Sequence, residues 1–568
     1  MHTSFIAFYA LALSLLLLSH PIAASPIIAY TPCGPVLGTS SPAANGTVAA
    51  FFGLRFGNQP IRWSEASPAP CWTGGTFNAS ALGPPCIQIT GAGSEDCLFL
   101  SVFSPLLVDA KLPTDLPVHV YIHGGSLIEG SGNTDASAFS VRANVVSVVI
   151  QYRLTWSGWL LTSGFSSDKN ATGNVGVLDM QLALRWVRDN IKGFGGDASR
   201  VTLAGQSSGG TAIFALLSAP SSRGLFHRAI ALSGSPNISM SRTEKLSQDN
   251  AFVIAAGCGS LAPVAELSCL RAADVATLTA AQLTSWHTPG IFSVLLPSAS
   301  GFNRVYGGLA VVDGFVIPAS FEDAFVSGTV DVPVIMSGQA QECDLGPGDD
   351  VRSLTAPEWR AWLEARAILG GWGTESASAL ASALYDAYAA EMLVGGAQRA
   401  YDTINADYGT ACALVRIATR AKNEGERASP VYLAVNAWQP SIPIGRDAKR
   451  PLTMAYHMHD WLVGFELWPT PANASAVYPG APDKALAALL QGAWASLMHD
   501  GVVDPSRSGG WRSVEDVPAW PASYGSLRIT SAHLPPFLPT AFVTDQRAHV
   551  CALLRAFNMT SAAWWWVN

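Results

Sequence analysis

One short stretch in the first half of the chain limits the fold more than any other feature. Residues 201–212, "VTLAGQSSGGTA", contain a serine with a glycine two positions before it and another two positions after it. The apolar residues before the motif predict a buried strand, and those after it predict a helix. A serine exposed at such a tight turn needs very small flanking residues because the backbone approaches closely. The spacing predicts Ser207 as a nucleophile between Gly205 and Gly209, whereas Ser208 does not fit; the alternative is an ordinary turn.

The whole chain favours one large domain. It has 568 residues, of which 49% are hydrophobic, so it can bury a large core. Neither a low-complexity linker nor a repeat nor a long charge run divides it, which favours a single domain over residues 25–568 with long inserted loops. The net charge of -8 and the lack of a basic cluster argue against a nucleic-acid partner.

The N-terminus has the pattern of a secretory signal. Residues 1–24 contain an apolar run from Phe5 to Leu18 and end in small residues. The alternative is a membrane anchor, but the run is shorter than the roughly 20 residues that span a bilayer, and no later segment is long enough. We therefore expect a secreted, extracellular protein without a transmembrane segment in its mature chain.

Secretion predicts glycans and disulfides. The chain has nine cysteines, an odd number, so at least one is expected to be free or paired elsewhere. The N-x-S/T glycosylation sites are Asn45, Asn78, Asn170, Asn237, Asn473 and Asn558.

Several further stretches share a resemblance with one family. They are "EDCLFLSVFSP" (95–105), "VYIHGGS" (120–126), "QYRLTWSGWL" (151–160) and the unbroken block from Asn174 to Gly210. Together they resemble the type-B carboxylesterase/lipase family, which includes cholinesterases, carboxylesterases and fungal lipases. The resemblance implies an α/β-hydrolase fold, a mostly parallel central sheet flanked by helices. The alternation of β-rich apolar runs with helical-length segments such as 179–191 agrees with that fold.

The resemblance implies an acid and a base downstream of the serine, in the order usual for these hydrolases. The stretch "VPVIMSGQAQEC" places Glu342 at the acid position, although Gln339 and Cys343 replace the usual Asn and Gly; Asp344 is the alternative acid. The stretch "MAYHMHDWLVGF" makes His457 the base when Asp460 takes the family's acidic position. His459 is the alternative base.

The resemblance also implies the groups that surround the triad. The oxyanion hole would consist of the backbone N–H groups of Gly124, Gly125 and Ser208, so that Ser208 acts through its amide and not its hydroxyl. Ser233 matches a family serine beneath the acid and the base. It would either support Glu342 by a hydrogen bond or be a buried structural serine.

The family's disulfide pattern implies three pairs and leaves three cysteines over. Whether Cys33 and Cys71 pair is left open, and Cys343 would then be the odd thiol. The implied pairs are Cys86–Cys97, Cys258–Cys269 and Cys412–Cys551.

The loop between Cys86 and Cys97, "IQITGAGSED", is short and has no aromatic residue. In the resembled cholinesterases and fungal lipases this loop is longer and supplies a choline-binding Trp or a lid. Gln206 also replaces the family's frequent Glu before the nucleophile, which removes a charge that favours cationic substrates. These features disfavour a cholinesterase and favour a carboxylesterase over a lid-dependent lipase.

The resulting hypothesis is a secreted serine hydrolase that cleaves carboxylic esters through an acyl-enzyme, without a metal or an organic cofactor. Its partner would be a small-molecule or lipid ester; the acyl chain, the alcohol and the oligomeric state are left open. The first alternative is a triacylglycerol lipase or sterol esterase of the same family. The second is a non-catalytic adhesion or binding protein, as in the neuroligin branch.

Overall fold

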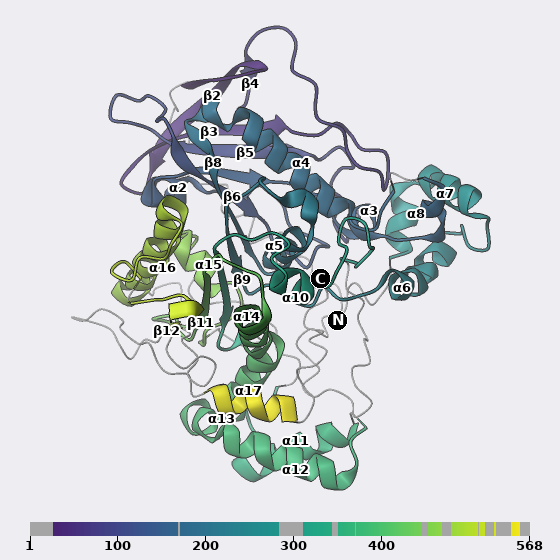
Figure 1. Cartoon of the computed structure of the whole chain (residues 1–568), viewed down its shortest axis with the longest axis vertical. Helices are drawn as coiled ribbons and strands as arrows, with labels where there is room; N and C mark the ends of the chain where they lie inside the picture. Colours follow the sequence, from purple (N-terminus) through teal and green to yellow (C-terminus); the bar gives the residue numbers. More distant parts are fainter. Residues whose placement is uncertain are drawn as a thin grey trace.

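A twelve-stranded sheet forms the centre of the computed structural model (Figure 1). The structure describes residues 27–168, 171–282, 310–342, 350–369, 371–444, 453–468, 479–508, 510–516, 527–529 and 547–556. The strand order is β1-β2-β3-β5-β7-β6-β8-β9-β10-β11-β12, and β4 pairs with β2. The strands are β1 (Ile27–Thr31), β2 (Gly34–Ala43), β3 (Gly46–Arg55), β4 (Phe77–Asn78), β5 (Phe99–Pro105), β6 (Leu116–Ile122), β7 (Val146–Ile150), β8 (Gly196–Gln206), β9 (Arg228–Leu232), β10 (Val334–Gln339), β11 (Val431–Asn436) and β12 (Leu527–Ile529).

The sheet is antiparallel at its N-terminal edge and parallel beyond it. The pairs β1–β2, β2–β3, β3–β5 and β5–β7 are antiparallel. Every pair from β7–β6 to β11–β12 is parallel. This arrangement matches the mostly parallel sheet that the resemblance implied, and the carboxyl ends of its parallel strands meet along one edge.

Helices occupy the connections between the strands and cover both faces of the sheet. Helix α4 contains most of the helix expected at 179–191. The helices are α2 (Ser137–Ala143), α3 (Thr155–Trp159), α4 (Val175–Asn190), α5 (Ser208–Ser218), α6 (Arg242–Ala255), α7 (Pro263–Ala272), α8 (Val275–Ala280), α10 (Phe321–Val326), α11 (Ala356–Leu369), α12 (Thr374–Ala387), α13 (Ala389–Ala406), α14 (Cys412–Glu424), α15 (His459–Gly464), α16 (Ala481–Asp500) and α17 (Arg547–Ala556).

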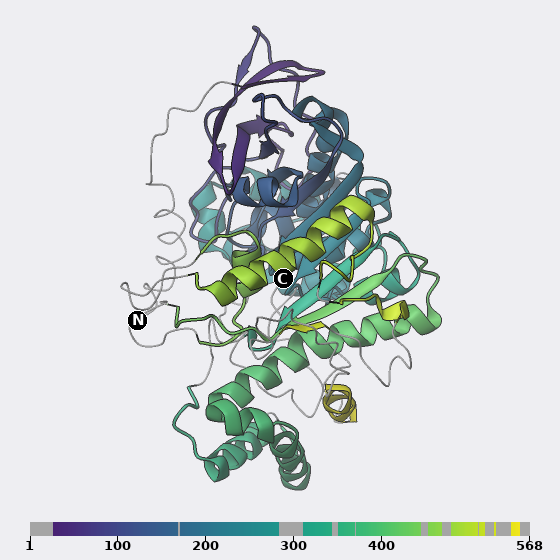
Figure 2. The same cartoon turned by 90° about the vertical axis from the view of Figure 1, so that its left-hand side faces the viewer.

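The alternation of side chains along β6 divides the core into two layers. Val118, Val120 and Ile122 belong to the apolar cluster that contains the buried faces of α4 and α5. Tyr121 points to the opposite face and packs in the cluster formed with α2 and α16. Figure 2 shows α16 lying across this second face. Because both faces are covered, strands β6, β7, β10 and β11 are buried over almost their whole length.

A third apolar cluster is built by helices. It contains buried residues of α11, α12 and α13, together with residues of α17. The disulfide Cys412–Cys551 joins the start of α14 to α17. These helices lie at the lower end of the molecule in Figure 1, beyond the sheet.

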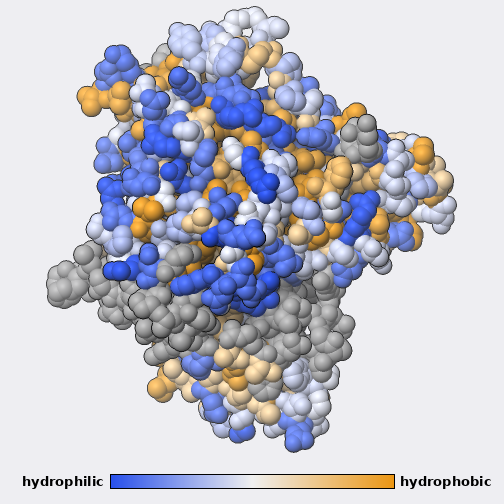
Figure 3. Space-filling view, in the orientation of Figure 1, coloured by the Kyte–Doolittle hydropathy of each residue, from blue (hydrophilic) through white to orange (hydrophobic). Residues whose placement is uncertain are grey.

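The surface shown in Figure 3 is mostly hydrophilic over the upper body, with apolar side chains gathered near the middle of the face. Within the described ranges, no helix is both long and apolar enough to cross a bilayer. Of the glycosylation sites, Asn45 and Asn78 are exposed and Asn237 is half-buried. The signal segment 1–24, Asn170, Asn473 and Asn558 lie outside the described residues.

The described residues contain four disulfides. Three join the pairs implied by the resemblance: Cys86–Cys97, Cys258–Cys269 and Cys412–Cys551. The fourth joins Cys33 to Cys71, the pair that the sequence left open. The ninth cysteine, Cys343, lies outside the described residues.

Candidate active site

Ser207 lies at the turn between the end of β8 and the start of α5. Its backbone has φ 60° and ψ -128°, a left-handed φ that a non-glycine residue rarely adopts. A Cβ atom at Gly205 would lie 2.5 Å from backbone atoms of Gly209, and one at Gly209 would lie 2.1 Å from the carbonyl oxygen of Ile122. Both positions therefore require glycine, which is the close approach that the motif predicted.

Glu342 and His457 form a buried pair. Nδ1 of His457 lies 2.6 Å from Oε2 of Glu342, and the two residues are 4% and 0% exposed. The second carboxylate oxygen accepts a hydrogen bond of 2.6 Å from the backbone N–H of Gln339. An ionised carboxylate can only accept, so beside an ionised Glu342 the neutral imidazole of His457 would carry its proton on Nδ1 and leave Nε2 as an acceptor. The alternative acid, Asp344, lies outside the described residues.

Gln206 joins the imidazole to the serine turn. Its side-chain Nε2 lies 3.1 Å from Nε2 of His457, and the residue is only 2% exposed. The imidazole of His457 therefore lies between Glu342, just after β10, and the residue that precedes Ser207. Three segments that are far apart in the sequence meet at this edge of the sheet.

His459, the alternative base, has different surroundings. It is fully buried, and its ring packs 5.0 Å from that of Tyr456. Burial lowers the pKa of His459 to about 4. The hydrogen bond to Glu342 comes from His457.

The loop after β6 lies directly against Ser207. A Cβ atom at Gly124 would lie 3.0 Å from the Cβ atom of Ser207. Gly125 has φ +110°, and a Cβ atom there would lie 2.2 Å from the carbonyl oxygen of Glu129. Both glycines are thus required by close backbone contacts, and the loop lies next to the serine, where the oxyanion hole was expected.

Ser208 has a role that the sequence did not reveal. Its hydroxyl oxygen accepts a hydrogen bond of 3.1 Å from the backbone N–H of Leu127, in the loop after β6. The prediction assigned Ser208 a function in the oxyanion hole through its amide and not its hydroxyl, and it did not foresee this structural hydrogen bond of the hydroxyl. The reason is tertiary, since only folding brings Leu127 to the start of α5.

Ser233 follows β9 and is 1% exposed. Its N–H donates to the carbonyl oxygen of Ser337, whereas its hydroxyl has no hydrogen-bond partner among the described residues. The hydrogen bond to Glu342 that the resemblance implied is therefore not formed between these two described residues. The burial of Ser233 agrees with the alternative interpretation, a buried structural serine.

Asp460 adds a second buried carboxyl group beside Glu342. It is 1% exposed and accepts hydrogen bonds from the Ser337 hydroxyl (3.3 Å) and from the N–H of Trp461 (2.8 Å). Burial, followed by the negative charge of Glu342, raises the pKa of Asp460 to about 6. In the sequence analysis Asp460 served only to identify His457 as the base. The distance between Asp460 and Glu342 depends on packing, so the sequence did not indicate it.

The chain is similar to known proteins over most of its length. Residues 25–530 match the model of the Carboxylesterase family. A medium-chain fatty acyl-CoA hydrolase precursor from Anas platyrhynchos is 37% identical over 251 residues, which cover 40% of this chain and 44% of that protein. Carboxylesterase 1F from Mus musculus is 32% identical over 345 residues, which cover 56% and 59%. The chain thus spans about half the length of the curated relatives it matches.

Solved structures share the fold over most of the chain. A PNB esterase has a TM-score of 0.62 and 25% identity, with 86% of this chain and 93% of the other covered. A thermophilic PNB esterase has a TM-score of 0.65 at 24% identity and covers 89% and 96%. The similarity confirms the predicted α/β-hydrolase fold. Taken with the family match over residues 25–530, these findings show that the chain belongs to the carboxylesterase family.

Proposed function

We propose that this protein is a serine esterase that cleaves carboxylic esters with Ser207, His457 and Glu342. The observation that carries the proposal is the position of the His457 imidazole. One edge contacts Glu342 at 2.6 Å, and the other edge contacts Gln206, the neighbour of Ser207, at 3.1 Å. A nucleophile, a base and a group that orients the base are the minimum set for this chemistry.

In the proposed mechanism, Oγ of Ser207 attacks the acyl carbon while Nε2 of His457 takes its proton. The carboxylate of Glu342 stabilises the imidazolium that forms. The tetrahedral intermediate then collapses, and His457 returns the proton to the leaving alcohol. Water repeats the sequence on the acyl-enzyme, which releases the acid and restores Ser207.

The N–H groups of Gly124, Gly125 and Ser208 would stabilise the negative oxygen of the intermediate. Backbone donors suit this purpose because the fold holds them in place before charge develops. The close contact between Gly124 and Ser207 supports this assignment.

Neutral esters are the proposed substrates. Gln206 is uncharged, and the loop closed by Cys86 and Cys97 contributes no aromatic platform for a cation. The relatives are named as carboxylesterases and a medium-chain fatty acyl-CoA hydrolase. Substrate preference is therefore best measured with a panel of esters and thioesters of graded chain length.

Secretion remains part of the proposal. It is supported by the signal-like segment 1–24 and by four disulfides, which persist in oxidising compartments. The exposed sequons at Asn45 and Asn78 are accessible to glycosylation.

The test of the function is Ser207→Ala, assayed on short p-nitrophenyl esters. We expect turnover to be abolished while the protein stays folded. Ser218→Ala is the matched control, because Ser218 lies at the other end of α5 and its hydroxyl donates within the helix, to the carbonyl oxygen of Phe214. Activity near the wild-type level in Ser207→Ala would overturn the proposal.

Two alternatives are separated by simple assays. A lipase or sterol esterase would show a jump in rate when the substrate forms droplets, whereas an esterase would saturate smoothly on soluble esters. A non-catalytic adhesion protein would not be labelled by a fluorophosphonate probe. Labelling that Ser207→Ala removes would exclude that alternative.

A further inference from the structure

The loop after β6 has an unusual backbone. Gly125, Ser126 and Leu127 have φ values of 110°, 57° and 58°, so three successive residues lie in the left-handed region. Two of them carry side chains, which makes the conformation unfavourable by itself. Such a backbone persists only where surrounding contacts hold it.

Residues Tyr152, Thr155 and Ser208 provide some of these contacts. The hydroxyl of Tyr152 donates to the carbonyl oxygen of His123 at 2.8 Å. The N–H of Leu127 donates to the hydroxyl of Ser208, and its carbonyl oxygen accepts from the N–H of Thr155 at 2.8 Å. These bonds fix the beginning and the middle of the loop.

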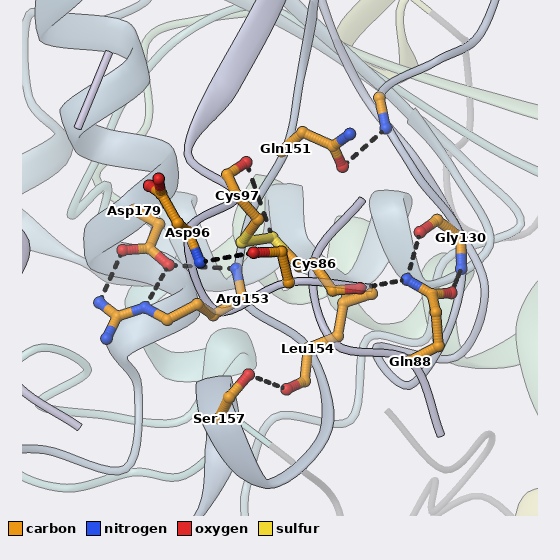
Figure 4. Close-up of a disulfide and its surroundings, with 12 residues drawn as sticks. Cys86, Gln88, Asp96, Cys97, Gly130, Gln151, Arg153, Leu154, Ser157 and Asp179 are labelled. Atoms are coloured by element: carbon orange, nitrogen blue, oxygen red, sulfur yellow. Dashed lines mark hydrogen bonds and ion pairs between the residues drawn. A yellow bond between two sulfur atoms is a disulfide. The ribbon is translucent and has the colours of Figure 1, made fainter. Parts of the chain in front are cut away.

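The end of the loop is held by Gln88, which lies inside the Cys86–Cys97 disulfide loop. Its Oε1 accepts from the N–H of Gly130 at 2.8 Å, and its Nε2 donates to the carbonyl oxygen of Gly130 at 3.0 Å. The same Nε2 donates to the carbonyl oxygen of Cys86 at 2.7 Å. Figure 4 shows the amide of Gln88 facing Gly130 with both of its polar atoms.

Gly130 packs against the peptide that joins Gly124 to Gly125, which contains the proposed donor N–H of Gly125. A Cβ atom at Gly130 would lie 2.4 Å from the carbonyl oxygen of Gly124 and 2.6 Å from Nδ1 of His123. This packing leaves no room for a side chain at Gly130, so Gly130 and the peptide of Gly124 lie against each other, and we expect a shift of one to displace the other. Gln88 is thus two contacts away from the proposed oxyanion hole.

The disulfide loop is a compact support for Gln88. The N–H of Gln88 donates to the carbonyl oxygen of Ala92 at 2.7 Å, and the N–H of Ser94 donates to that of Pro85 at 2.9 Å. A further bond of 2.8 Å joins the N–H of Ile89 to the carbonyl oxygen of Ile128. The two loops are therefore connected by both backbone and side-chain hydrogen bonds.

We propose that Gln88 is a positioning residue for ester hydrolysis, which holds the strained 124–130 loop so that the N–H groups of Gly124 and Gly125 face the reacting oxygen. This inference rests on the proposed function. It assigns the short disulfide loop a role in catalysis, whereas the sequence associated that loop only with substrate specificity.

Displaced oxyanion donors stabilise the transition state less, whereas they affect the binding of the substrate little. We therefore expect kcat to fall while KM changes little. Misplacement of a catalytic group by about 1 Å costs as much as about a hundredfold in rate. Because other contacts still hold the loop, we expect a fall of about tenfold or more in Gln88→Met.

The test compares Gln88→Met with Gln282→Met. Gln282 also bonds the disulfide loop, but its Nε2 donates to the carbonyl oxygens of Ile89 and Thr279, not to Gly130. The measurements are kcat per site labelled with a fluorophosphonate, KM, and the affinity for a trifluoromethyl ketone, which forms a tetrahedral adduct with serine. Labelling is run to completion so that it counts folded sites.

In Gln88→Met we expect kcat and ketone affinity to fall together with KM unchanged, and in Gln282→Met we expect all three within twofold of wild type. Gln88→Ala gives the same comparison if the methionine variant does not fold. If the wild type is active and the kcat of Gln88→Met or Gln88→Ala is within twofold of the wild-type value, the inference is overturned. The proposed function is then left intact. A wild type without ester hydrolysis would instead overturn the proposed function.

Discussion

The side-chain amide of Gln206 contacts the imidazole of His457, with 3.1 Å between the two Nε2 atoms. On its other edge the same ring contacts Glu342. The imidazole thus has a carboxylate on one side and a neutral amide on the other. This asymmetry distinguishes the chain from the family pattern, in which the position of Gln206 is frequently a glutamate.

We expect Gln206→Glu to change the pH dependence of ester hydrolysis. A carboxylate near Nε2 of His457 favours the protonated imidazole, which cannot accept the serine proton. The acid limb of kcat/KM should therefore move to higher pH, by about 1 to 3 pH units for a charge at this distance. Preference for a choline ester over its neutral 3,3-dimethylbutyl analogue should rise. Gln206→Met, which removes the contact without adding charge, is the control; an acid limb at the same pH in Gln206→Glu and wild type would contradict the prediction.

Glu342→Gln should inactivate the enzyme while the fold is kept. Oε1 of Glu342 accepts from the N–H of Gln339, so a glutamine would keep its oxygen there and turn its NH2 toward Nδ1 of His457. Nδ1 would then become the acceptor and Nε2 would carry the proton, the wrong tautomer for a general base. The expected loss of kcat is about 10⁴-fold, measured by steady-state kinetics.

A matched control for this variant is Glu266→Gln. Glu266 is also buried and accepts from the N–H of Gly164, but its helix, α7, lies on the opposite side of the molecule in Figure 1 from α15, which follows His457. Its replacement should leave kcat within a few fold of wild type. Equal losses in the two variants would show a general structural effect instead of a tautomer effect.

Asp460→Asn should make stability less dependent on pH. Burial and the charge of Glu342 raise the pKa of Asp460 from 3.8 to about 6, so the folded protein binds this proton more tightly than the unfolded chain. The contribution of Asp460 to stability is complete below about pH 4 and is lost as the pH rises through 6. Relative to wild type, Asp460→Asn should gain up to about 3 kcal/mol between pH 4 and pH 7, seen as a growing difference in Tm. A Tm difference between Asp460→Asn and wild type that does not vary with pH would refute this prediction.

Thr155→Gly should stabilise the protein. Thr155 is fully buried, its hydroxyl has no hydrogen-bond partner among the described residues, and its φ is 53°, which is strained for a β-branched residue. Relief of that strain should raise the free energy of unfolding by about 1 kcal/mol, measured as Tm at a fixed scan rate. Thr162→Gly is the control, since Thr162 is 3% exposed and its hydroxyl also lacks a hydrogen-bond partner among the described residues, but its backbone is extended, with φ -130°. Thr162→Gly should lose stability. A fall of Tm in both variants would contradict the claim that the positive φ of Thr155 strains the backbone.

The sequence by itself was sufficient for the features that depend on local sterics. Gly205 and Gly209 are required because their backbones contact neighbouring chain segments too closely for a Cβ atom. That requirement appears as a fixed spacing around Ser207, so it can be recognised without coordinates. The mostly parallel sheet was implied by the family resemblance, and the continuously apolar runs agreed with it, because strands covered on both faces of a sheet are largely apolar.

Only the tertiary structure decided the contacts between segments that are distant in the chain. Nothing in the sequence around Gln206, Gln88 or Asp460 indicates that they contact His457, Gly130 and Ser337, and the hydroxyl of Ser208 was assigned no function. Those distances follow from how the β6, β8 and β10 ends meet and how the disulfide loop packs on them. A side chain's local sequence determines which bonds it can form, but the packing of the whole core determines which partner lies within 3 Å.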